Sequence, residues 1–210
     1  MTEKTPEPST GTPEPPDVTS EAASLIEQWE FVGEAPTRDR VTELLSRLPS
    51  VWGVKTVDFA DYVQALPQRK KIKVPREPGS TVMIDQYLDC WTLYMSVAGR
   101  MKMLEAAAEQ NGWMVDFEPE PVTPTGCPGM LQMDERVVYR EYVRIEAWTT
   151  DEDGTPRIRK LGRKSGTAWV PSRGGSGAVS SNPYEKVETS ARGRAIAAWG
   201  FGVLPGSGVA

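Results

Sequence analysis

One stretch of the chain alternates its side chains along a strand without interruption: VVYREYVRIEAWT at positions 137–149. Successive side chains of a strand point to opposite faces, so odd and even positions form separate surfaces. The odd positions suit a core and are Val137, Tyr139, Glu141, Val143, Ile145 and Ala147. The even positions interleave arginines with aromatic residues and are Val138, Arg140, Tyr142, Arg144, Glu146 and Trp148. The pattern predicts a half-buried strand with one face available to solvent or a ligand.

A hairpin partner is expected directly after this strand. The segment DEDG at 151–154 is typical of a turn, and RIRKLGRKSGTAWV at 157–170 then returns as a second strand. In this strand Arg157, Arg159 and Arg163 share one parity with Trp169. Leu161 interrupts the alternation, so we expect a β-bulge near Lys160 or Gly162.

The last helix has a well-marked start. Asn182 suits the N-cap, Pro183 the first turn, and Glu185 lies three residues after the cap, where its carboxylate reaches back. The helix is expected to continue to about Trp199. Its small residues are Ala191, Gly193, Ala195, Ala197 and Ala198. They favour close packing, while Arg192, Arg194, Thr189 and Ser190 on the same helix offer groups that bind phosphate; neither interpretation excludes the other.

Other elements follow from apolar spacing and stop signals. We expect helices at 20–31, 37–48 and 97–111, the last ending at Asn111-Gly112, a strand at 113–118 and a Pro/Gly-rich loop at 119–133. The stretch 54–66 suits a strand or a helix equally. Residues 1–18 are rich in Pro, Thr and Glu and predict a disordered tail.

These elements predict an α+β fold: a helix, a three-stranded antiparallel β-sheet and a helix form the core, preceded by a disordered N-terminal tail. We divide the chain into the tail at 1–18, a helical or mixed region at 19–80 and the core region at 81–210. The chain has 210 residues, a length that one moderate domain plus a tail accounts for.

Composition excludes several kinds of chemistry. The chain has no histidine and two cysteines, so His-dependent catalytic triads and the usual His/Cys zinc sites cannot form. Cys90 and Cys127 are expected to be free thiols. No apolar run is long enough for a membrane span and no secretory signal is apparent, which favours the cytoplasm. We therefore expect no enzyme activity, no cofactor and no membrane association.

Charge is segregated along the chain, although the whole carries a formal −5. Residues 136–210 hold 12 Lys and Arg against 7 Asp and Glu, a net +5, so residues 1–135 carry −10. Because the field at a surface depends on local charge, the C-terminal part is suited to an anionic ligand.

The segment PYEKVETSARGRAIAAWGFG at 183–202 resembles a signature of phage single-strand annealing proteins, those of the essential recombination function (Erf) type and their Redβ-like and Sak-like relatives. The match is close from Pro183 to Ala195, and SGTAWV at 165–170 stands where such proteins end a strand. The expected order of helix, strands and helix over residues 85–204 resembles the β-β-β-α core of that superfamily. Arg192 differs, because such proteins usually carry an apolar residue there.

The resemblance implies ATP-independent annealing of single-stranded DNA in phage recombination, in the host cytoplasm, by a homo-oligomeric ring or filament. Single strands bind where cations track phosphates and aromatic rings stack on bases. The expected DNA-binding residues are Arg140, Tyr142, Arg144, Trp148, Arg157, Arg159, Lys160, Arg163, Lys164, Arg192 and Arg194.

Alternatives remain open. The seven tryptophans also suit a phage regulator that binds a host protein or a recombinase, and the N-terminal region is a possible site for a protein partner. A metal-dependent nuclease would use Glu118, Glu120, Asp134 and Glu135. The basic cluster at 69–76 is either a second DNA contact or a solvated loop.

Overall fold

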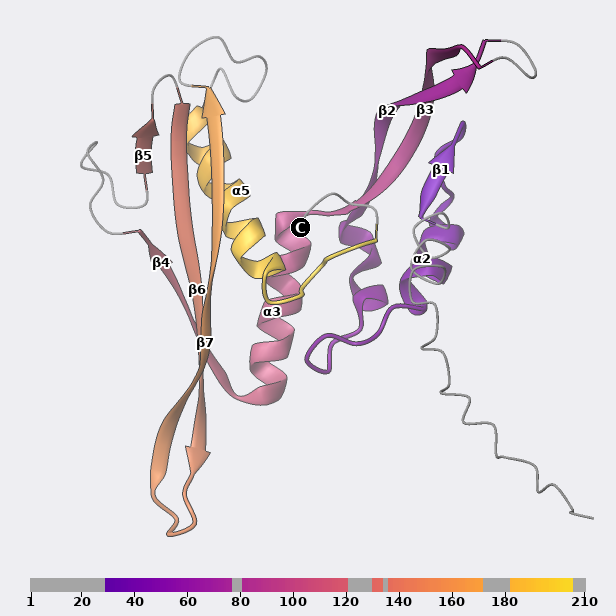
Figure 1. Cartoon of the computed structure of the whole chain (residues 1–210). Coiled ribbons are helices and arrows are strands. Elements are labelled where there is room, and N and C mark those ends of the chain that lie inside the picture. Colours follow the sequence, from indigo (N-terminus) through magenta and orange to yellow (C-terminus); the bar gives the residue numbers. More distant parts are fainter. Residues whose placement is uncertain (1–28, 77–80, 121–129, 134–135, 172–181, 206–210) are drawn as a thin grey trace, which may run out of the picture.

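A computed structural model describes residues 29–76, 81–120, 130–133, 136–171 and 182–205. The fold is α+β with antiparallel sheets, as predicted (Figure 1). The predicted tail at 1–18, most of the helix at 20–31, most of the loop at 119–133 and Cys127 lie outside the described residues.

The larger sheet is built around one long central strand, β6. On one edge β6 pairs along its length with β7, and on its other edge it pairs first with β5 and then with β4, all antiparallel. The sheet is therefore three strands wide where β4 or β5 flanks β6, and two strands wide at the hairpin end, where β7 is the described partner of residues 148–150. Its strands are β4 (Trp113–Pro119), β5 (Met130–Met133), β6 (Arg136–Thr150) and β7 (Pro156–Pro171).

The smaller sheet has the order β1-β3-β2, and its strands are β1 (Glu30–Val32), β2 (Val63–Pro75) and β3 (Met83–Met95). β2 and β3 pair over thirteen positions, whereas β1 covers only three at their base. The β2–β3 ribbon consequently extends away from the rest of the molecule as an arm (Figure 1). The ribbon joins β2 and β3 across residue 80, where the sequence suggested a boundary between two regions.

Within the described residues, four helices accompany the sheets: α2 (Arg38–Ser46), the 3₁₀ helix η1 (Thr56–Tyr62), α3 (Val97–Asn111) and α5 (Pro183–Ala197). α5 packs against β6 and β7, and α3 packs against α5 (Figure 1). Ser96 caps the start of α3, its hydroxyl accepting from the Gly99 amide, and Gly112 in the left-handed conformation caps its end.

The small residues of α5 serve close packing. A Cβ added at Gly166 of β7 would lie 2.1 Å from the Ala191 carbonyl oxygen and 2.3 Å from the Ala195 nitrogen. Gly193, on another side of the helix, lies against Val97 of α3. The helix backbone thus rests directly on the strand, and only residues with little or no side chain permit that approach.

Three tryptophans connect segments of the core that are distant in sequence. The Trp199 indole donates to the Val143 carbonyl oxygen at 3.1 Å, and the Trp52 indole donates to the Trp199 carbonyl oxygen at 3.1 Å. Trp52 also meets Trp113 edge to face, with ring centroids 5.2 Å apart. Three of the seven tryptophans therefore join a loop, β4 and the end of α5.

The predicted helices at 37–48, 97–111 and from 183, and the strands at 113–118, 137–149 and 157–170, are confirmed. Two assignments need correction. Residues 30–31 belong to β1, because pairing with β3 overrides a helical spacing, and β5 occupies the end of the predicted loop. The stretch 54–66, which suited a strand or a helix, contains both η1 and the start of β2. The strand at 83–95 was not predicted.

Candidate nucleic-acid interface

The even positions of β6 lie on the sheet face opposite α5, as predicted. We call this surface the outer face; register adds the β7 and β4 residues that stand beside these positions. Its members are Arg136, Val138, Arg140, Tyr142, Arg144, Glu146 and Trp148 of β6, Ile158, Lys160, Arg163, Ser165, Thr167 and Trp169 of β7, and Met114, Asp116 and Glu118 of β4.

A β-bulge divides the predicted β7 residues between two faces. Gly162 stands opposite Ile145, but Lys160 stands opposite Glu146, so Leu161 is the extra residue. The predicted bulge is confirmed. In the part of β7 before Leu161, even positions lie on the outer face, whereas after Leu161 odd positions do. Arg163 stays on the outer face with Trp169, whereas Arg157 and Arg159 pair with Thr149 and Ala147 and continue the helix-covered face. The expectation that all three arginines share one face is wrong.

Carboxylates of β4 and of Glu120, just after it, neutralise the outer-face arginines. Arg144 contacts Asp116 at 2.7 Å and Glu118 at 3.0 Å, Arg163 contacts Glu118 at 2.9 Å, and Arg140 contacts Glu120 at 3.1 Å. The hydrogen bond to Asp116 raises the pKa of Arg144. Asp116 is exposed, whereas Glu118 and Glu120 are half-buried. An exposed pair such as Arg144–Asp116 is worth at most about 1 kcal/mol.

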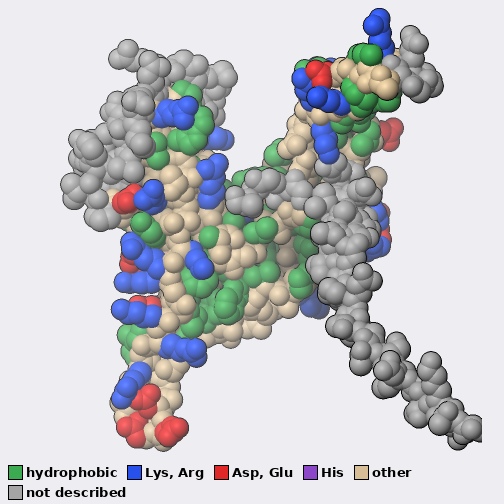
Figure 2. Space-filling view, in the orientation of Figure 1, with side chains coloured by type: hydrophobic (Ala, Val, Ile, Leu, Met, Phe, Trp, Pro, Cys, Tyr) green, Lys and Arg blue, Asp and Glu red, His purple; other side chains and the backbone are tan. Residues whose placement is uncertain are grey.

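The acidic and aromatic parts of the outer face lie side by side. Asp116 and Glu118 lie on β4 and Glu146 lies on β6, while the exposed aromatic residues lie on β6 and β7. Trp148 is 59% exposed and Trp169 is 51% exposed. The Arg136 guanidinium lies 4.3 Å from the Trp169 ring centre and that of Arg163 lies 3.6 Å from the Tyr142 ring centre. Cation and ring therefore alternate along the β6–β7 side of the face. Figure 2 shows Lys and Arg side chains along this flank of the sheet, with Asp and Glu among them.

The remaining predicted residues belong to the other side of the sheet. Lys164 stands opposite Val143, with its ammonium 6.0 Å from the Trp199 ring centre. Arg194 donates to the Thr167 carbonyl oxygen at 2.5 Å. These residues do not join the outer face, and Ser190 donates within its own helix to the Lys186 carbonyl oxygen at 2.8 Å.

Arg192 forms a two-pronged ion pair beneath the sheet. Its Nε and Nη2 donate to the two carboxylate oxygens of Glu141 at 3.0 and 2.9 Å, and Nη2 also contacts Glu188 at 3.1 Å. Glu141 is only 2% exposed, and its hydrogen bonds raise the pKa of Arg192. The arginine that departs from the annealing-protein signature is thus matched by a buried acid on the odd face of β6. We assign this pair to packing rather than ligand binding.

Two outer-face features were absent from the predicted site. Arg136 lies one residue before the strand predicted at 137–149. Because it has the same even parity as the outer-face residues, a strand longer by one residue would have included it. The acids of β4 alternate with Trp113, Val115 and Phe117, and this alternation was readable in the sequence. The ion pairs with the arginines themselves follow from the tertiary structure.

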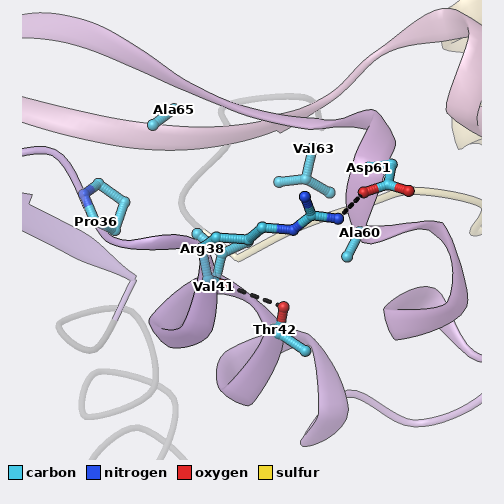
Figure 3. Close-up of a pocket in the computed structure, with 8 residues that line it drawn as sticks. All are labelled: Pro36, Arg38, Val41, Thr42, Ala60, Asp61, Val63 and Ala65. Atoms are coloured by element: carbon cyan, nitrogen blue, oxygen red, sulfur yellow. Dashed lines mark hydrogen bonds and ion pairs between the residues drawn. The ribbon is translucent and has the colours of Figure 1, made fainter.

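A small pocket of about 270 Å³ lies between α2 and the start of β2 (Figure 3). Arg38 and Asp61 form an ion pair at its side, and both are well exposed. Val41, Val63 and Ala65 form apolar lining. Its solvent-exposed ion pair and apolar walls provide no arrangement of nucleophile and base.

Among the described residues no group of three or more His, Cys, Asp or Glu is placed to hold a metal ion. Glu118 and Glu120 contact arginines, and Asp134 and Glu135 lie outside the described residues. Cys90 is a buried free thiol. Within the described ranges, no helix has the length and apolar character needed to cross a membrane. The chain matches no protein-family model, no curated protein and no solved structure.

Proposed function

We propose that this protein binds single-stranded DNA on the outer face and anneals it to a complementary strand without hydrolysing nucleotide, as a phage recombination protein in the host cytoplasm. The observation that carries the proposal is the β6–β7 side of the outer face, where Arg136 lies over the exposed Trp169, Arg163 lies over Tyr142, and Trp148 is a further exposed ring. Rings of this kind stack on bases of any sequence, and cations beside them hold phosphates.

The path of the bound DNA across the sheet follows from charge. Asp116 and Glu118 on β4 repel phosphate, so the DNA lies over β6 and β7, from Trp148 towards Trp169. Lys160 and Arg163 stand on that path. Arg163, whose side chain is 47% exposed, exchanges the Glu118 carboxylate for a phosphate.

Annealing on this face needs no covalent step. Phosphate neutralisation lowers the repulsion between two strands, and stacking on one side of the bases leaves their pairing edges free for a complement. One protomer covers few nucleotides, so we propose a ring or filament of identical chains. β2 and β7, which are edge strands of the described sheets, are available for contacts between copies.

The test is fluorescence anisotropy of a labelled oligothymidylate at several salt concentrations. Lys160→Ala removes an outer-face cation, and we expect the slope of log affinity against log salt to fall by about 0.7, the value for one single-strand phosphate contact. Arg159→Ala is the matched control, because it removes a neighbouring exposed cation from the opposite face. Equal effects of the two variants, or no binding at low salt, would contradict the proposal.

A second candidate is a regulatory protein that docks on a host protein or recombinase. The ion pairs of Arg144 and Arg140 favour it, since they leave Trp148, Ile158 and Trp169 as exposed apolar groups on a nearly neutral face. An apolar interface tolerates salt, whereas DNA binding weakens steeply with it. The N-terminal region is a candidate site for such a partner, and deletion of residues 1–18 tests that role by partner capture.

A further inference from the structure

The β2–β3 arm has two chemically different faces. Register places the odd positions of both strands together, and these carry Pro67, Arg69, Lys71 and Lys73 on β2 with Trp91, Asp89, Tyr87 and Asp85 on β3. The even positions carry mainly apolar or uncharged groups, among them Leu66, Ile72, Val74, Ile84 and Leu88. We call the odd surface the charged arm face.

A groove of about 460 Å³ opens at the base of this face. Trp91, Pro67 and Arg69 line it together with Asp89. The Trp91 indole donates to the Gly33 carbonyl oxygen at 3.0 Å, which fixes the ring's orientation at the groove wall. The groove therefore has a positioned aromatic wall with a guanidinium beside it, the two groups that stack on a base and hold its phosphate.

A second ring continues the line towards the arm's tip. Tyr87 is 56% exposed and lies on the same face of β3 as Trp91, with Asp89 as the same-face position between them. Adjacent same-face positions are about 6.7 Å apart along a strand, so the rings form two well-separated platforms. The Arg69 guanidinium lies 5.5 Å from the Tyr87 ring centre.

Charge favours a polyanion on this arm. The charged arm face carries Arg69, Lys71 and Lys73 against Asp85 and Asp89, a net +1 within a chain of net −5. Lys71 pairs with Asp85 at 2.7 Å and Arg69 with Asp89 at 3.5 Å, all four groups being exposed. Lys73 stands next along the face, beyond these pairs.

We infer that the charged arm face is a second single-stranded nucleic-acid contact, in which Trp91 and Tyr87 stack on bases while Arg69, Lys71 and Lys73 hold phosphates. The inference rests on the proposed function and adds a surface separate from the outer face. It also gives the basic cluster at 69–76 a role as a structured contact, since its residues lie on a paired strand and not in a loop.

Anisotropy of labelled oligothymidylate at low salt tests the inference with three variants. Tyr87→Ala removes an exposed platform, and we expect binding to weaken about 10-fold. Lys73→Gln is expected to lower the salt slope by about 0.7. Lys70→Gln is the matched control, because Lys70 lies on the other face of the same strand; it should retain the wild-type slope. Thermal unfolding confirms that each variant is folded.

Trp169→Ala on the outer face separates the two possible failures. If wild type binds and Trp169→Ala weakens binding, while Tyr87→Ala and Lys73→Gln bind as wild type does, the arm inference is overturned and the proposed function stands. Equal slopes for Lys73→Gln and Lys70→Gln also overturn it. If wild type does not bind the oligonucleotide at low salt, both proposals fail.

Discussion

Arginine pairs with carboxylate on both faces of β6, but the pair on one face is buried and the pair on the other is in contact with water. On the helix-covered face, Glu141 is buried and meets Arg192 through two hydrogen bonds. On the outer face, Arg144 meets Asp116 and Glu118 in contact with water. A buried pair is costly to break because the remaining charge is left without water, whereas an exposed pair exchanges partners readily. The first face is therefore suited to holding the fold, and the second to exchanging its counter-ions for a ligand.

Breaking the buried pair should give the largest effect. Arg192→Ala leaves the Glu141 carboxylate, which is 2% exposed, without its guanidinium partner, and we expect the free energy of unfolding to fall by about 3–5 kcal/mol in urea denaturation. Glu118→Ala on the outer face is the control and should cost less than about 1 kcal/mol. Similar losses for both variants would abolish the distinction between the faces.

The contact between α5 and β7 should be nearly as sensitive. Gly166→Ala places a methyl group within 2.1 Å of the Ala191 carbonyl oxygen, so the helix has to move away from the strand. We expect a loss of about 3 kcal/mol by the same denaturation measurement. Ser165→Ala, next along β7 on the outer face, should be close to neutral; an equally neutral Gly166→Ala would contradict the packing described.

Alkaline pH tests the covered face through Tyr139. Burial raises the pKa of Tyr139 from 10.0 to about 12, which means that the folded state favours the neutral phenol. This contribution to stability is complete below pH 10 and disappears as the pH rises through 12, about 2–3 kcal/mol in all. Unfolding measured at pH 9 and pH 12 should show a smaller loss for Tyr139→Phe than for wild type. An identical loss would show that the phenol titrates normally.

A substitution on the outer face should change the affinity for DNA while the free energy of unfolding hardly changes. Glu118→Gln removes a negative charge that pairs with Arg144 and Arg163, so both guanidinium groups become more available to phosphate. We expect unfolding to change by less than about 1 kcal/mol and affinity for oligothymidylate to increase a few-fold at fixed salt. Weaker binding would mean that the carboxylate helps to form the site.

Local sequence patterns predicted the parts of the fold that local physics controls. Alternation predicted β6, the Asn111-Gly112 stop signal predicted the C-terminal end of α3, and capping residues predicted the start of α5. The two-residue period also predicted which side chains of β6 are buried. Pairing between distant segments was less accessible: β1 adopts a strand only because β3 lies beside it, and the arm's two faces require its register.

The candidate site was predicted in part for the same reason. The outer-face residues of β6 were identified from parity alone, but the bulge at Leu161 moves Arg157 and Arg159 to the other face. The arginines of α5 carry charge suited to phosphate, yet Arg192 meets Glu141 across 51 residues of sequence. Whether a cation has a partner depends on tertiary contacts, which periodicity does not encode.

Photocrosslinking tests the central claim most directly. An oligothymidylate containing 5-iododeoxyuridine is bound at low salt and irradiated, and the crosslinked peptides are mapped by mass spectrometry. The account predicts crosslinks at Tyr142, Trp148 and Trp169 on the outer face, with any crosslinks at Tyr87 and Trp91 in addition to these. Bound DNA that crosslinks only to α5, or only to the arm, would contradict the assignment of the outer face as the principal binding surface.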